Sequence, residues 1–193
     1  MSHRLTVSLC VMILAAAGGC SSDPMSPSSG SVTVLLTDAP IDLSQVSGVW
    51  VTLDELLLYG EDSDDDVLEM DLPPISTGAG LTLNLLDFQN GETFAIAELE
   101  APAGDYHKLR MRVAEAWLTR DDDNDSGTPD LEEPIFVPSG KVDIPVPFSL
   151  GGGEKVEVTI DFDAQASVQV NATPGRHAYI LRPVITPVSV TRR

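Results

Sequence analysis

The chain has 193 residues, of which 30 are aspartate or glutamate and 11 are lysine or arginine, giving a formal net charge of −19 at pH 7. A protein this acidic is a poor partner for nucleic acid and for anionic lipid headgroups, so we expect neither as a ligand. The length suits one domain with a sizeable hydrophobic core, preceded by short targeting segments.

The first 19 residues have the layout of a bacterial export signal. Arg4 supplies a positive charge, an apolar run extends from Leu5 to Ala17, and two glycines lead into Cys20. This run is shorter than the about 20 apolar residues that cross a bilayer, which indicates a cleaved secretory signal. The sequence Ala17-Gly-Gly-Cys20 resembles the lipobox, whose cysteine is acylated and becomes the first residue after cleavage. We therefore predict a signal peptide at residues 1–19 and a membrane anchor through the lipid on Cys20.

Residues 20–30 are rich in serine and proline and have no apolar periodicity, so we predict a flexible tether. Ser21 follows the lipidated cysteine, as is typical of lipoproteins sent to the outer membrane. The sequence does not distinguish the periplasmic from the surface face. The two cysteines are Cys10 and Cys20, so the following domain has no internal disulfide and must be stabilised by its core or by bound metal.

Residues 31–193 read as a single domain made of strands. Apolar residues alternate with polar ones in several runs, and we find no helical periodicity. Val142 to Leu150 and Val156 to Phe162 are the clearest runs, and Gly151-Gly152-Gly153 between them predicts a β-hairpin. Pro145 and Pro147 cannot donate to a strand ladder, which places their strand at a sheet edge. The pattern predicts an all-β, antiparallel β-sandwich or barrel.

Five segments, taken in order, resemble one known family. They are Gly30-Ser-Val-Thr-Val-Leu-Leu-Thr-Asp-Ala-Pro40, Ala103-Gly-Asp-Tyr106 with Leu109-Arg110, Val137-Pro-Ser-Gly140, Asp161-Phe-Asp-Ala164 with Ser167-Val168, and Leu181-Arg-Pro-Val-Ile185. The chain is similar to a bacterial and archaeal lipoprotein domain of unknown function. The resemblance implies a β-sandwich of the transthyretin-like or carboxypeptidase-regulatory-like type. It implies no activity and no catalytic residue.

Catalytic sequence templates are missing. There is no Gly-x-Ser-x-Gly elbow, phosphate loop or dinucleotide fingerprint. His107 alternates in step with Leu109 and Met111, which points it toward the core or its margin, and a histidine there is more often structural than catalytic. His177 receives the same interpretation.

Asp161 and Asp163 flank Phe162, so both carboxylates are expected on the polar face of a strand whose phenylalanine is buried. Paired carboxylates serve glycoside hydrolysis or metal binding. The alternative, which we favour, is a strand end whose aspartates cap the following turn. Asp38, just before Ala39-Pro40, is interpreted in the same way as a turn residue.

Two other groups are candidates for binding. Lys108, Arg110 and Arg112 lie on one face of a strand, either as an anion site or, as we favour, in a cross-strand ladder with acidic residues such as Glu157 or Asp161. Trp50 is out of phase with its apolar neighbours and is expected to face outward. Trp50 and Trp117 are the side chains best suited to stack on a sugar ring.

Two acidic runs stand out. Residues 61–66 have no regular spacing and predict a solvated hairpin tip. Residues 122–133 have the spacing of a calcium loop, with a glycine at its sixth position. The predicted ligands are Asp122, Asn124, Ser126, Thr128, Asp130 and Glu133. A proline at the eighth position and strand-like flanks argue instead for a solvated acidic tip, and both interpretations stay open.

These features favour a non-enzymatic module with a ligand-binding or structural role, tethered to the cell envelope and stabilised by calcium if residues 122–133 form the predicted site. A cell-surface glycan and an envelope protein are the expected classes of partner. A glycan hydrolase using Asp161 and Asp163 is the alternative, and a purely architectural envelope protein is the third interpretation.

Overall fold

The computed structural model describes residues 28–38, 46–61, 66–73, 80–120, 131–170 and 178–193. The secondary structure of this part consists of strands and two short helices, a 3-10 helix η1 (Leu85–Phe88) and a one-turn helix α1 (Ala164–Ser167). The strands are β1 (Ser29–Thr37), β2 (Gly48–Gly60), β3 (Val67–Glu69), β4 (Leu81–Asn84), β5 (Phe94–Pro102), β6 (Gly104–Arg120), β7 (Leu131–Phe136), β8 (Lys141–Leu150), β9 (Lys155–Phe162), β10 (Val168–Val170), β11 (Tyr179–Leu181) and β12 (Ile185–Arg192).

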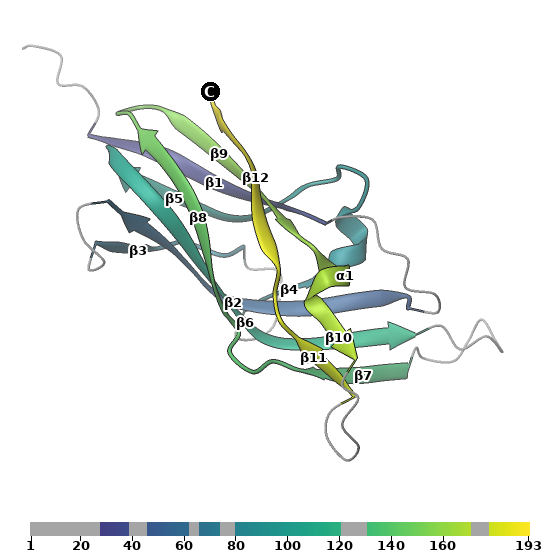
Figure 1. Cartoon of the computed structure of the whole chain (residues 1–193). Helices are drawn as coiled ribbons and strands as arrows, with labels where there is room; N and C mark the ends of the chain where they lie inside the picture. Colours follow the sequence, from purple (N-terminus) through teal and green to yellow (C-terminus); the bar gives the residue numbers. More distant parts are fainter. Residues whose placement is uncertain (1–27, 39–45, 62–65, 74–79, 121–130, 171–177) are drawn as a thin grey trace, which may run out of the picture.

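The strands form two sheets packed as a sandwich (Figure 1). The smaller sheet has the order β12-β9-β1-β5, and the larger has the order β10-β11-β7-β6-β2-β3, with β4 paired to β2 and β8 paired to β6. The all-β sandwich predicted from the alternating pattern is thus confirmed. The sheets are mixed, because β1 pairs with β9, and β7 with β11, in parallel.

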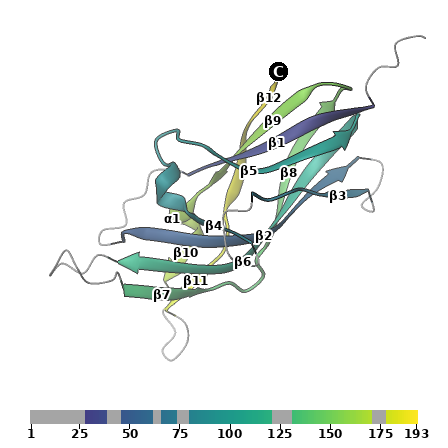
Figure 2. The same cartoon turned by 180° about the vertical axis from the view of Figure 1, so that it is seen from behind.

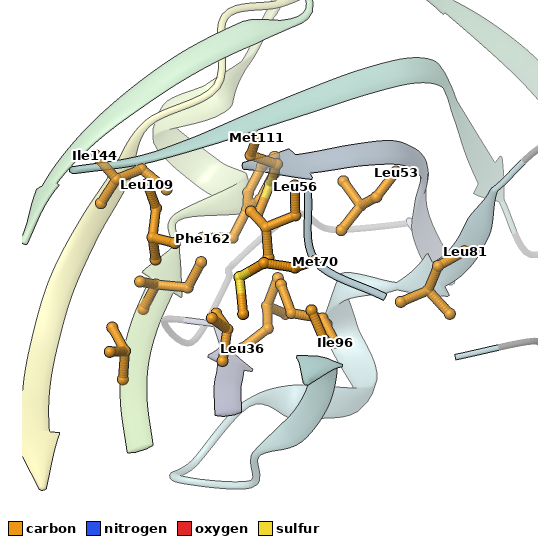
Figure 3. Close-up of a cluster of buried hydrophobic side chains, with 14 of the residues drawn as sticks. Leu36, Leu53, Leu56, Met70, Leu81, Ile96, Leu109, Met111, Ile144 and Phe162 are labelled. Carbon is orange, nitrogen blue, oxygen red and sulfur yellow. The ribbon is translucent and has the colours of Figure 1, made fainter. Parts of the chain in front are cut away.

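Alternation places the core between the sheets. Every second residue of β1 and β9 is buried, including Phe162, which has 0% exposure. Figure 3 shows side chains from both sheets meeting in this layer, among them Leu36 and Phe162 from the smaller sheet and Leu109 and Met111 from the larger. Apolar burial on this scale stabilises a domain that has no disulfide in its core.

The predicted hairpin between β8 and β9 is wrong. β8 pairs with β6 in one sheet, whereas β9 pairs with β1 and β12 in the other. The glycine turn therefore carries the chain from one sheet to the other. It is held by β1, because the Gly153 N–H donates to Ser29 O (2.8 Å) and the Ser31 N–H donates to Glu154 O (2.9 Å). A glycine turn between two alternating runs fits both a hairpin and such a crossing, so only the distant partners decide between them.

The predicted edge position of β8 is confirmed within the described residues, since β6 is its ladder partner and Pro145 and Pro147 are exposed. The expectation of no helix misses η1 and α1, each of which has four residues. Helices this short carry too few residues to show a 3.6-residue period.

Strand β6 organises the larger sheet. One of its edges is paired with β2 along most of its length, as the view from behind shows (Figure 2). Its other edge is shared, because β8 pairs with residues 104–112 and β7 pairs with residues 117–120. The two partner strands separate over the residues in between, and this separation positions the groove described below.

Candidate functional site

Two tryptophans form a platform on the outer face of the larger sheet. Trp50 on β2 is directly opposite Trp117 on β6, and both are half-buried. Their ring centroids are 6.0 Å apart and their planes differ by 3°, so the two indoles are stacked parallel to each other. Both rings face outward, because the residues on either side of each, such as Val49 and Leu118, are buried in the core. The predicted outward direction of Trp50 is therefore confirmed.

The Trp50 ring is held in place by its neighbours. Its indole Nε1–H donates to Thr119 Oγ1 at 3.3 Å, and the Ser47 hydroxyl donates to the same oxygen at 3.1 Å. Gly48 makes room for the ring, because a Cβ at this position would lie 2.5 Å from the indole nitrogen. The ring is consequently preorganised, which lowers the entropic cost of stacking against a ligand.

A groove of about 550 Å³ continues the platform between β6 and β7. Pro134 of β7 is opposite Trp117, and Phe136 on the same face is 43% exposed. The groove lies where the β7 ladder ends and before the β8 ladder begins, so residues 114–116 of β6 form one wall. An apolar concave surface with a few polar groups is typical of small-ligand sites.

Asp163 has a structural role. It is the N-cap of α1, and its Oδ1 accepts a hydrogen bond from the Ala166 N–H at 2.7 Å. The capping interpretation of this residue is confirmed. Asp161 is half-buried at the end of β9, between Thr37 of β1 and Thr186 of β12 in the strand register.

The role of Asp38 was missed by the sequence analysis, which treated it as a turn residue. The side chain is only 3% exposed, and its Oδ1 accepts a hydrogen bond from the Ala164 N–H at 2.9 Å. Burial raises the pKa of Asp38 to about 6, against the lowering effect of that hydrogen bond, and the charges of Asp161 and Asp163 raise it further. Asp38 therefore joins the end of β1 to the start of α1.

The basic row on β6 is a cross-strand ladder, as predicted, but its partners differ from those expected. Asp143 of β8 accepts a bidentate pair from Arg110, at 2.5 and 2.8 Å, and lies 3.9 Å from Lys108. Arg112 pairs with Asp54 at 2.8 Å. The hydrogen bonds from Arg110 hold the pKa of Asp143 below its usual value.

Glu157, one of the expected partners, pairs with Arg193 at 3.0 Å. The error follows from the predicted hairpin, because β8 and not β9 is the neighbour of β6. With acidic residues already beside all three basic side chains, the row does not resemble an open anion site.

His107 lies at the margin of the core. A bulge between Tyr106 and Lys108 shifts the alternation, so Tyr106 is buried and its hydroxyl donates to Pro102 O at 2.7 Å. The half-buried His107 ring lies edge-on to Tyr59, with centroids 6.3 Å apart. A structural role for His107 is consistent with these contacts, and His177 lies outside the described residues.

Most of the predicted calcium loop also lies outside the described residues, namely Asp122, Asn124, Ser126, Thr128 and Asp130. Glu133 is described, and its Oε1 lies 3.3 Å from Arg120 Nε. Within the described ranges no group of three histidine, cysteine or acidic side chains is arranged to hold a metal ion. The calcium hypothesis therefore stays a prediction from the spacing of residues 122–133.

If this loop binds calcium with the about 10⁻⁴–10⁻³ M affinity of extracellular modules, millimolar calcium should raise the melting temperature by about 2–7 °C. The double variant Asp122→Ala/Glu133→Ala should abolish the shift, whereas neutralising Asp64 and Asp65 should leave it intact. Differential scanning calorimetry with calcium and with chelator checks this. Identical melting curves in the two buffers would mean that the loop is only a charged tip.

Cys20 lies outside the described residues, so the lipid anchor stays a prediction from the sequence. In the part of the chain that the structure describes, no helix is long and apolar enough to cross a membrane.

Comparison with known families supports the sequence resemblance. The model of a domain of unknown function, DUF4382, matches residues 29–183, which include the strands from β1 to β11. Comparisons with curated proteins and with solved structures found no match. Since the family model covers most of the chain, from the first strand of the sandwich onward, this protein belongs to the DUF4382 family of domains of unknown function.

Proposed function

We propose that this protein is a lipid-anchored binding protein of the bacterial cell envelope, whose sandwich domain binds a glycan without chemical turnover. The observation that carries the proposal is the pair of parallel, half-exposed indoles of Trp50 and Trp117. Aromatic rings offer a large, rigid apolar area that pairs with the C–H faces of sugar rings. Pro134 and Phe136 extend this apolar surface across β7 into the groove.

The charge of the chain distinguishes a glycan from other ligands that stack on aromatic rings. Bases of single-stranded nucleic acid also stack on such platforms, but the proteins that bind them carry a basic groove along the backbone. With 30 acidic and 11 basic residues, this chain repels a polyphosphate. A sugar polymer without phosphate meets no such barrier.

We place the function on the platform and not on the alternative carboxylate pair. A glycoside hydrolase needs one carboxyl group to move a proton and a second to attack or to activate water. Asp163 is engaged as the cap of α1. Asp38 is a third carboxyl group near Asp161 and Asp163, and it is buried and accepts a hydrogen bond from the backbone of Ala164. These contacts favour a structural role for the three aspartates.

The platform proposal predicts a large effect of Trp117→Ala on affinity. We expect the purified full chain to bind at least one of chitohexaose, cellohexaose and a muropeptide mixture. Trp117→Ala should weaken that binding at least tenfold, which is about 1.4 kcal/mol, because the ligand loses the apolar area of one indole and the other loses the ring it is stacked against. Isothermal titration calorimetry measures the affinity, and sugar analysis of the incubated ligand tests for cleavage.

Val188→Ala is the matched control, since Val188 is an exposed apolar residue on β12, in the other sheet. It should bind like the unmodified chain. Equal affinities for Trp117→Ala and the unmodified chain would rule out the platform. Cleavage that disappears in Asp161→Asn would favour the hydrolase instead.

The anchor is the second part of the proposal and rests on the sequence around Cys20, while calcium stabilisation rests on residues 122–133. We expect Cys20→Ser to abolish membrane attachment without unfolding the domain, because the described core contains no cysteine. Carbonate washing of membranes followed by immunoblotting measures attachment, with Ser22→Ala as the control. Recovery of Cys20→Ser in the washed membrane pellet would contradict lipidation at this residue.

A further inference from the structure

The charged side chains that line the groove beside the tryptophan platform are both acidic. Glu115 lies two residues before Trp117 on β6, and Glu132 lies two residues before Pro134 on β7. Both glutamates are exposed and both line the groove. Residues two apart in a strand share a face, so the carboxylates lie on the same side of the sheet as the indole of Trp117. Since Trp117 is opposite Pro134, the two carboxylates flank this pair at opposite ends.

Among the described residues that line the groove, none is basic. Two of the nearby cationic side chains, Arg120 and Arg112, have acidic partners of their own, whereas the exposed Lys141 lies opposite Arg112 beyond the groove lining. Arg120 is three residues from Trp117 and so faces the other side of the sheet, where it bonds to the Tyr179 hydroxyl and lies beside Glu133. Arg112 is held by Asp54. The ionisable side chains that line the groove itself are two carboxylates, which attract cations.

An indole face adds to this attraction. The negative face of an aromatic ring attracts a cation, and tryptophan is the most effective of the aromatic side chains. An ammonium group stacked near Trp117 would thus interact favourably with the ring and with a carboxylate at either end of the groove. A sugar carboxylate in the same place would be repelled by both glutamates.

We infer that the groove selects glycans that carry a free, protonated amine, of the glucosamine type, over their N-acetylated counterparts and over uronic acids. The inference rests on the proposed glycan-binding function and names its ligand class. The contact with the sugar rings comes from the tryptophans, whereas the selection comes from Glu115 and Glu132.

The test compares hexamers of glucosamine, N-acetylglucosamine and galacturonic acid by calorimetry with the full chain, in mildly acidic buffer at low and high salt. We expect the glucosamine hexamer to bind at least fivefold more tightly than the N-acetylated one, with a preference that shrinks as salt rises. Galacturonate should bind most weakly. Glu115→Gln/Glu132→Gln should remove the preference, because it should weaken binding of the glucosamine hexamer much more than binding of the N-acetylated one.

Glu98→Gln/Glu100→Gln is the matched control, because these two exposed glutamates lie on β5 in the other sheet and the variant has the same net charge. It should keep the preference. Equal binding of the amine-bearing and N-acetylated hexamers, both weakened by Trp117→Ala, would overturn the inference and leave the platform standing. Loss of the preference in the control variant would also overturn the inference, by showing that overall charge is responsible. No binding of any hexamer would overturn the inference and count against the proposed function itself.

Discussion

Phe162→Ala is expected to lower the free energy of unfolding by about 3–5 kcal/mol, the usual cost of removing a fully buried phenylalanine. The ring has 0% exposure and lies between the two sheets (Figure 3). Its loss removes apolar contacts and leaves a cavity that the surrounding strands fill only in part. Urea denaturation followed by circular dichroism measures the change in the free energy of unfolding. Circular dichroism is preferred to tryptophan fluorescence because both tryptophans lie on the outer face of the larger sheet, away from Phe162.

Phe136→Ala is the matched control for this variant, since Phe136 is 43% exposed on β7. It should cost less than about 1 kcal/mol, in proportion to the smaller area removed from water. A comparable loss for the two variants, or a loss below about 1 kcal/mol for Phe162→Ala, would contradict the register of β9.

Asp38→Asn is expected to stabilise the protein at alkaline pH and to have little effect at acidic pH. Burial raises the pKa of Asp38 from 3.8 to about 6, so the folded protein keeps a proton that the unfolded chain has released. The favourable contribution of the protonated carboxyl is complete below about pH 4 and is lost as the pH rises through about 6. One pKa unit corresponds to about 1.4 kcal/mol, so the variant should gain up to about 3 kcal/mol at pH 8.

Urea denaturation of both proteins across this pH range checks the prediction. The asparagine side chain retains an oxygen that accepts from the Ala164 N–H, whereas Asp38→Ala removes this acceptor. The alanine variant should therefore be less stable than the asparagine variant at every pH, by about 1–3 kcal/mol. A stability difference between Asp38→Asn and the unmodified chain that does not change with pH would contradict an elevated pKa.

The period-two alternation in the sequence predicted the fold class and several of the strands with the side chains that they bury. It identified the buried positions of β1, β8 and β9, because a strand with one buried face repeats every two residues. It did not identify which strands pair. The β8–β9 turn was interpreted as a hairpin, and the expected partners of Arg110 were wrong for the same reason.

The bulge at Tyr106–Lys108 limits how far the alternation can be extrapolated. It shifts the alternation by one residue, so Tyr106 is buried in the core, while His107, expected toward the core or its margin, lies at the margin. The hydrogen bond from the Tyr106 hydroxyl to Pro102 O shows which aromatic residue the structure buries. A bulge of this kind has no sequence signature when its extra residue is not glycine.

The candidate site depended on long-range register, which a single sequence does not contain. Trp50 alone was a weak sign of a binding surface. The local signal was its position in the alternation, which placed it on the opposite face from Val49 and Val51. The platform exists because β2 and β6 pair with Trp50 directly opposite Trp117, residues that are 67 positions apart. The burial of Asp38 likewise depends on the contact of its carboxylate with Ala164, far along the chain.

The most direct test of the account is an NMR titration of the full chain, labelled with ¹⁵N, with the glycan that binds most tightly by calorimetry. The chain contains two tryptophans, so it has two indole N–H signals, and both belong to the platform. We predict that both signals shift and saturate with the same affinity as the calorimetric titration, together with backbone amides of Glu115 and Phe136. Saturable binding that leaves both indole signals unmoved, and shifts amides of the smaller sheet instead, would contradict the platform as the binding site.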